Sequence, residues 1–186
     1  LPVLGTVAVP RAVALGGVAL LGAAWFSVLY HFIDVTGQPL VLVAEAVVAV
    51  GAAAYLAHSL RARVAVAVSA ALLVLGLAAY VLSLPTRPPV GPLVTDAVTL
   101  VTGRTLLQVT NVDLWVLGVA PGPLFLSAYF GLRRRYVSAT LVGGGTLAFL
   151  VLTGDAGNVI TLLGVVGAVT AVGVGDAERR GDDIGA

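Results

Sequence analysis

Residues 12–33 read AVALGGVALLGAAWFSVLYHFI, a run that contains no Asp, Glu, Lys or Arg. A helix needs about 20 consecutive, mostly apolar residues to cross the roughly 30 Å of hydrocarbon in a bilayer. The run therefore predicts a membrane-spanning helix. Arg11 precedes it, as a basic residue precedes the core of a signal peptide. The run is longer than such cores, however, and further apolar runs follow, so we interpret it as a first span.

Five more apolar runs of similar character follow along the chain. They cover residues 39–60, 64–84, 112–132, 137–152 and 159–175. The sequence therefore predicts an all-α integral membrane protein with six transmembrane helices in a single domain, residues 1–175. Residues 176–186 are expected to form a polar cytoplasmic tail or linker.

The overall composition supports a bilayer as the surrounding medium. Hydrophobic residues make up 59% of the chain and charged residues 10%, whereas a soluble domain carries about 25% charge. Too little polar surface remains to cover a water-soluble particle, so lipid is the expected partner. The net charge of +1 indicates no nucleic-acid partner.

The arginines predict an orientation for the six spans. With the N-terminus in the cytoplasm, the only outer arginines are Arg87 and Arg104. The inner segments then hold Arg11, Arg61, Arg63, Arg133, Arg134, Arg135, Arg179 and Arg180. Short cytoplasmic loops carry such an excess of basic residues. We therefore expect a multi-pass protein of the cell membrane with both termini in the cytoplasm.

The long outer connection, residues 85–111, predicts a helix of a different kind. Four prolines within residues 85–92 bar a helix there. Apolar residues then recur with a helical period over residues 93–109, while Asp96 and Thr99 lie on another face. This pattern predicts an amphipathic helix on the outer surface. A re-entrant segment between the spans is the alternative.

Small residues in the last two spans predict where helices pack closely. Helices in lipid associate through small residues that let their backbones approach. The positions concerned are Gly143, Gly144 and Gly145 in the fifth span and Gly164, Gly167, Ala171 and Gly175 in the sixth. We expect packing within the chain, and a dimer interface is the alternative.

The fourth span contains two prolines, Pro121 and Pro123. Proline inside a helix removes a backbone hydrogen bond and usually kinks the helix. The two residues therefore predict a kink near the middle of the membrane. Broken helices also mark binding sites in transporters, which is the functional alternative.

Glu45 is the most informative single residue. It lies six residues into the second span, and an ionisable side chain within the membrane is costly and marks a functional candidate. A proton or cation site is one hypothesis. A hydrated notch, or a structural pair with a hydrogen-bonding partner, is the other.

Several polar residues map to the outer membrane surface and form a second candidate site. They are His31, Asp34, Asp113, Asp155 and Asn158. Hard cations prefer several oxygen ligands, but no metal-ligand spacing occurs, so solvated loop ends are the alternative. Asn111 and Asp113 can also cap the fourth span. The chain has no Cys, which excludes thiol catalysis, and the sequence predicts no catalytic residue, cofactor or metal.

Several stretches resemble the N-terminal membrane region of transglutaminase-like membrane proteins from halophilic archaea. They are SVLYH (27–31), DAVTLVTGRT (96–105), APGPLF (120–125), RRRY (133–136) and VLTGDAG (151–157). The resemblance implies a membrane anchor for an extracellular, papain-like transglutaminase domain at the cell envelope. It carries over no catalytic residue, because this chain has no Cys. The absence of Lys fits a halophilic source. The absence of Met leads us to expect that the sequence is a piece of a longer polypeptide.

Three functions remain open from the sequence. The first is a membrane anchor or scaffold, with the rest of its own polypeptide as partner. The second is a subunit of a larger membrane assembly, which meets other subunits through its small-residue faces. The third is a small proton- or cation-coupled transporter that uses Glu45.

Overall fold

The computed structural model describes residues 8–36, 39–59, 61–83, 90–153 and 155–180, and every regular element within these ranges is a helix. The prediction of an all-α fold is therefore confirmed for this part of the chain. The elements are α2 (Ala8–Thr36), α3 (Pro39–Leu56), α4 (Ala62–Ser83), α5 (Val90–Val101), the 3-10 helix η1 (Leu106–Gln108), α6 (Val112–Val119), α7 (Pro121–Leu132), α8 (Tyr136–Leu152) and α9 (Asn158–Arg180).

By length and apolar composition, four segments of helix can cross a membrane. They are Val9–Asp34, Pro39–Leu56, Val112–Leu132 and Asn158–Ala177. Three shorter apolar segments of helix, Ala62–Leu72, Gly91–Val101 and Tyr136–Leu152, accompany them. Large apolar side chains cover the outside of the bundle, for example Leu40 on α3, which is 82% exposed. These features indicate a membrane protein, because lipid is the medium in which such a surface is stable.

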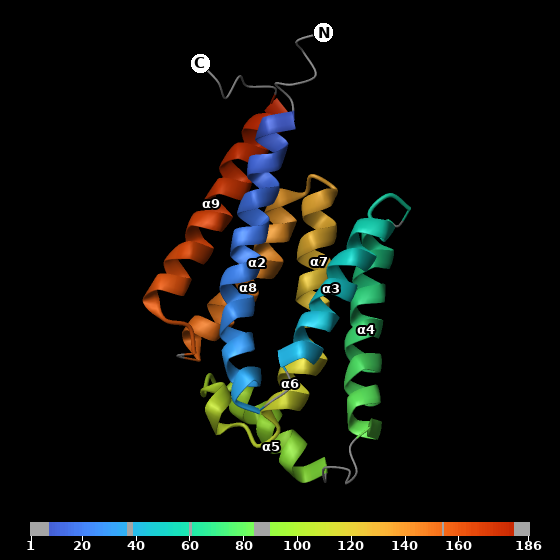
Figure 1. The fold of residues 1–186 in the computed structure, drawn as a ribbon, viewed down its shortest axis with the longest axis vertical. Coiled ribbons are helices and arrows are strands. Elements are labelled where there is room, and N and C mark those ends of the chain that lie inside the picture. The colour runs from blue at the N-terminus through green and yellow to red at the C-terminus, as the bar shows by residue number, and fades with distance from the viewer. Residues whose placement is uncertain (1–7, 37–38, 60, 84–89, 154, 181–186) are drawn as a thin grey trace.

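The helices form one bundle in which α2 and α9 lie side by side along much of their length (Figure 1). α8 and α7 pack against α2, while α3 and α4 contact α7 from the other side of the bundle. The start of α2, the end of α9 and the α3–α4 and α7–α8 connections share one end (Figure 1). α5 and η1 lie at the opposite end (Figure 1).

Glycine brings α2 and α9 into backbone contact. A Cβ atom on Gly17 of α2 would lie 2.6 Å from the backbone nitrogen of Ala171 and from the backbone oxygen of Gly167. A Cβ atom on Gly167 would lie 2.7 Å from the oxygen of Gly17. Only glycine fits this crossing, and Ala171 beside it is fully buried. Gly167 and Ala171 of α9 therefore pack within the chain, against α2.

The other small residues divide between buried and open positions. Cβ atoms on Gly164 and Gly175 would collide with the side chains of Leu147 and Tyr136, so both positions pack against α8. Gly143 faces Leu21 of α2 at 3.0 Å. Gly144 and Gly145 have no atom within 4 Å of such a Cβ, so the second and third glycines of the run do not mediate close packing in this chain.

The two prolines of the fourth span divide it into α6 and α7. Ala120, between the two helices, keeps helical backbone angles (φ −55°, ψ −41°). The amide of Leu124 donates to the Ala120 oxygen at 3.3 Å, so the chain continues in the same direction. Pro121 and Pro123 lack the N–H groups that would continue the ladder. The interruption is local, and a buried hydroxyl supports it: Ser69 of α4 donates to the oxygen of Gly122 at 3.2 Å.

The outer helix is shorter, and starts earlier, than the predicted range 93–109. α5 begins at Val90, and Pro92 is tolerated because residues in the first turn need no N–H donor. It ends at Val101, and Gly103 then adopts a positive φ of 77°, a conformation that favours glycine. Pro85, Arg87, Pro88 and Pro89 lie outside the described residues.

α5 differs from the sequence expectation in the position of one polar residue. Asp96, assigned to the polar face, is 2% exposed, whereas Val94, Val98 and Val101 are exposed. These valines recur at a spacing of four and three residues and form an apolar stripe on the outside of the helix. The carboxylate points inward because the following loop supplies its hydrogen-bond donors. α5 therefore presents apolar side chains to its surroundings at the rim of the bundle.

Candidate functional site

A carboxylate at the end of the bundle that holds α5 organises the loop that follows this helix. The Oδ1 atom of Asp96 accepts a hydrogen bond from the Thr110 amide at 2.9 Å. Its Oδ2 atom accepts from the amide of Asn111 at 3.1 Å and from the Asn111 side chain at 2.8 Å. Three donors thus converge on one buried carboxylate, which ties α5 to the start of α6.

The same hydrogen bonds lower the pKa of Asp96 and occupy the Asn111 side chain, which was expected to cap α6. Burial raises the pKa of Asp96, but the hydrogen bonds from Asn111 and Thr110 outweigh burial, and the net pKa lies below 3.8. Asn111 was expected to cap α6 with its side chain. It makes no such bond, because its amide group donates to Asp96 instead.

Asp155, between α8 and α9, holds the same loop from its other side. Its Oδ2 atom accepts from the Leu106 amide at 3.0 Å and from the Thr153 hydroxyl at 2.6 Å. Leu106 itself is buried in the apolar core. Asp96 and Asp155 therefore clamp the segment between α5 and α6 onto the bundle. The predicted role of Asp155 as a cation ligand is unnecessary to account for its position.

The remaining members of the outer polar set do not gather around one point. His31 and Asp34 are exposed near the end of α2, and Asn158 is exposed at the start of α9. Asp113, in the first turn of α6, has a buried Oδ1 atom without a hydrogen-bond partner. Within the described ranges, no group of three or more His, Cys, Asp or Glu residues is placed to hold a metal ion. The structure thus offers no assembled cation site here.

Glu45 lies on α3, which the sequence expectation placed within the membrane. Six residues separate it from Pro39, about 9 Å along the helix axis at 1.5 Å per residue. The side chain is half-buried. Its Oε2 atom is fully buried and has no hydrogen-bond partner. A buried carboxylate oxygen without a donor is costly, so this position requires a chemical explanation.

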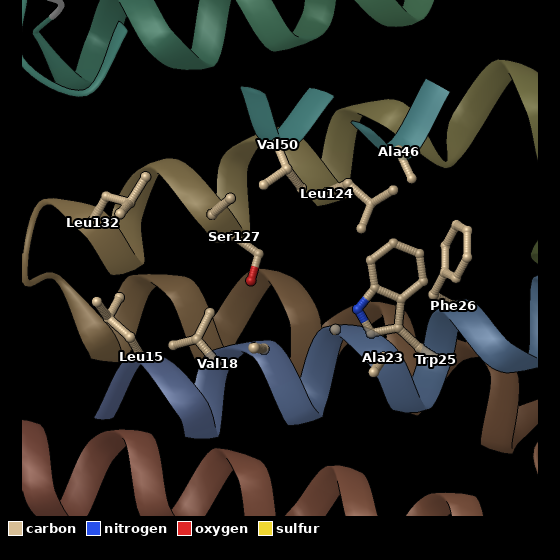
Figure 2. A pocket seen from close by; sticks show the side chains of 13 residues that line it. Leu15, Val18, Ala23, Trp25, Phe26, Ala46, Val50, Leu124, Ser127 and Leu132 are labelled. Carbon is tan, nitrogen blue, oxygen red and sulfur yellow. The ribbon is translucent and has the colours of Figure 1, made fainter. Parts of the chain in front are cut away.

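Two cavities in the described part of the bundle are almost wholly apolar. The larger, of about 410 Å³, lies between α2, α3 and α7. Figure 2 shows Trp25 and Phe26 of α2 at one end of this cavity, with Ala46 of α3 opposite them. The second cavity, of about 220 Å³, lies on the other side of Trp25. Neither cavity is lined by an acid, base or nucleophile set that suggests catalysis.

Sequence reasoning missed three polar residues that position the bundle: Asp96, Ser69 and Ser127. The Ser127 hydroxyl on α7 donates to the Ala139 oxygen on α8 at 3.2 Å. Lone serines within apolar runs carry no pattern that distinguishes an interhelical donor from a lipid-facing residue, since Ser also bonds within its own helix. For Asp96, the sequence offered one signal, which is that a carboxylate stands among apolar residues. Its hydrogen-bond donors, on residues 110 and 111, became apparent only from the fold.

Comparisons with known proteins identify no relative, since no family model, curated protein or solved structure matches this chain.

Proposed function

We propose that the chain is the membrane anchor and scaffold region of a cell-envelope protein. The observation that supports this function best is the use of its polar side chains. Asp96 and Asp155 hold the outer loop, and Ser69 and Ser127 join helices. The larger cavity has apolar walls. This distribution suits a bundle that fixes a position in the membrane and does not carry out a reaction.

The proposed topology has six spans, with both termini in the cytoplasm. Four segments of helix meet the length and apolarity that a span requires, and α4 and α8 supply the other two crossings. The α3–α4 and α7–α8 connections, which hold the arginine-rich turns, share one end of the bundle (Figure 1). Clustering of basic residues at one end favours the cytoplasm for that end.

α5 fits this topology as an interfacial helix. Its exposed valine stripe faces away from the bundle, and such a stripe enters the boundary between headgroups and acyl chains. The Asp96 and Asp155 clamps hold the loop that follows it. On this account the outer end of the bundle is a rigid platform. The resemblance to transglutaminase-like membrane proteins supports an extracellular domain of that class as the part that the platform carries. Because the proposed topology places residue 186 in the cytoplasm, that domain requires one further span to reach the outside.

The mass of the native polypeptide tests the anchor function. Purification from the native membrane, followed by intact-mass spectrometry and peptide mapping, is expected to give a polypeptide several times larger than 18.7 kDa. The additional mass is expected to include a transglutaminase-like domain with its own cysteine. A native mass near 18.7 kDa would contradict the anchor proposal and leave an assembly subunit or a carrier as the function.

A further inference from the structure

The register between α3 and α7 places Glu45 against the interruption of the fourth span. The two helices run in the same direction (Figure 1). Arg133, just after α7, donates from Nη1 to the oxygen of Ala57, just after α3, at 2.8 Å. This bond pairs positions 76 residues apart. The same offset pairs Glu45 with Pro121.

The packing of apolar side chains is consistent with this register. Ala49 and Ala53 of α3 belong to one buried cluster with Phe125 and Tyr129 of α7. Nearer the outer end, Leu42 belongs to a second cluster with residues of α2 and α6 and with Ala120. Glu45 lies between these two contacts.

Glu45 also lies on the packed side of α3. It follows Leu42 by three residues and precedes Ala49 by four, and both neighbours are buried. Residues at these spacings share one face of a helix. The face that carries Leu42 and Ala49 packs mainly on α7, with smaller contacts to α2 and α6. The carboxyl group is therefore on the side of the interrupted helix, and the burial of its Oε2 atom is consistent with that side.

The interruption offers a hydrogen-bond acceptor at this level. In a continuous helix the Leu117 oxygen would accept from the N–H of residue 121, but proline has none. Leu117 is 2% exposed, and buried backbone oxygens require partners. Ser69 satisfies the neighbouring oxygen of Gly122 from the α4 side. On the side that faces α3, the nearest candidate donor to the Leu117 oxygen is the carboxyl group of Glu45 in its protonated form.

We propose that Glu45 is a proton-binding site inside the membrane, which holds its proton between its own carboxyl group and the Leu117 carbonyl. The bound species is a proton taken from water onto a carboxylate oxygen, and loss of the proton regenerates the carboxylate. The half-buried state of the side chain leaves one side for exchange with the surroundings. A metal ion fits less well, because among the described residues no group of three or more His, Asp or Glu residues is placed to hold one with Glu45.

The charged and titratable groups on the helices packed against α3 lie toward its ends. Figure 2 places Trp25 and Phe26 of α2 level with Ala46, so on α2 Tyr30 is about one turn away. On α6 and α7, Asp113 and Tyr129 each lie eight residues from Pro121, about 12 Å along the axis. Farther from this level lie His31 and Asp34 at the outer end and Arg11 and Arg133 at the inner end.

None of these groups, among the residues that the structure describes, forms a countercharge at the level of Glu45. An ionised carboxylate without a countercharge is unstable in the membrane, whereas the neutral acid needs only one acceptor. The Leu117 oxygen is that acceptor. This site is independent of the anchor function, since an anchor, a carrier and an assembly subunit can each contain it.

Isotope labelling tests the protonation state in the folded protein. The chain contains two glutamates, Glu45 and Glu178, so side-chain ¹³C-labelled glutamate in a Glu178→Gln background reports on Glu45 alone. Infrared spectra in lipid vesicles at neutral pH are expected to show the C=O stretch of a protonated carboxylic acid, and Glu45→Gln is expected to remove it. A labelled carboxylate band in its place would overturn the proposal.

A second pair of variants tests the acceptor. Pro121→Ala restores the N–H that bonds the Leu117 oxygen in a continuous helix, and Pro123→Ala makes the same change two residues later. We expect Pro121→Ala to shift the Glu45 C=O stretch toward the frequency of a carboxylic acid without a hydrogen bond, and Pro123→Ala to leave it in place. Equal spectra for both variants and the parent would exclude the Leu117 carbonyl as the partner.

Discussion

Gly17→Ala is expected to destabilise the bundle by about 1–3 kcal/mol, the typical range for overpacking. The added methyl group would lie 2.6 Å from backbone atoms of Gly167 and Ala171. Backbone atoms cannot rotate away as a side chain can, so α2 and α9 must separate. The unfolding midpoint in mixed micelles, followed by the loss of helical circular dichroism, measures the change.

The neighbouring glycine provides a matched control. A Cβ atom on Gly16 has no atom within 4 Å, so Gly16→Ala is expected to leave stability unchanged or raise it by up to about 1 kcal/mol through helix propensity. Gly167→Ala and Gly173→Ala form the equivalent pair on α9, since only Gly167 faces a close backbone. Equal midpoints for Gly16→Ala and Gly17→Ala would contradict the close contact between α2 and α9.

Asp96→Asn is expected to release the outer loop and to cost about 1–3 kcal/mol, the penalty for leaving buried partners unpaired. The substituted amide places an NH₂ group against donors from Thr110 and Asn111. Hydrogen exchange at these two backbone amides is expected to accelerate, while the amides of α2 stay protected. Asp34→Asn, at an exposed position, is the control and is expected to change neither.

The same site has an expected pH dependence. The folded-state pKa of Asp96 lies below the ordinary 3.8, so its ionised form stabilises the fold. This contribution is complete above pH 3.8 and is lost as the pH falls through the lower folded-state pKa. The stability difference between the parent and Asp96→Asn is therefore expected to shrink below pH 3.8. A difference that stays constant or grows in acid would contradict the carboxylate clamp.

The helical runs could be predicted from the sequence because apolar length is a local property. Each of the six predicted runs coincides with a helix or, for residues 112–132, with the α6–α7 pair. The ends were less predictable. α3 stops at Leu56 although its apolar run continues to residue 60, and α9 continues to Arg180 beyond the predicted end at 175.

The inward position of Asp96 on α5 could not be predicted, because a helical period does not show which residues contact the loop that follows the helix. The sequence expectation assigned Asp96 to the polar face of an amphipathic helix on the outer surface. Near a membrane an apolar stripe can face lipid, and the loop after α5 supplies donors that draw Asp96 inward. The deciding contacts join Asp96 to residues 110 and 111, and no local pattern reveals them.

The candidate site was likewise predictable only in part. Glu45 was identifiable from the sequence, since a carboxylate within an apolar run is rare. Its proposed position beside Pro121 was not, because these residues belong to different helices and the register is inferred from the Arg133–Ala57 hydrogen bond. Similarly, the glycine spacing on α9 indicated close packing, whereas its partner Gly17 on α2 emerged only from the fold.

Cysteine accessibility in intact cells tests the six-span topology most directly, because the chain has no cysteine of its own. Single substitutions at the bundle ends would be labelled with a membrane-impermeant maleimide: Asp34→Cys, Ser59→Cys, Thr110→Cys, Ser138→Cys and Asn158→Cys. We expect the variants at 34, 110 and 158 to react from outside, and those at 59 and 138 to react only after permeabilisation. Reaction from the same side at both 59 and 110, or at both 138 and 158, would contradict a crossing by α4 or α8 and with it the six-span account.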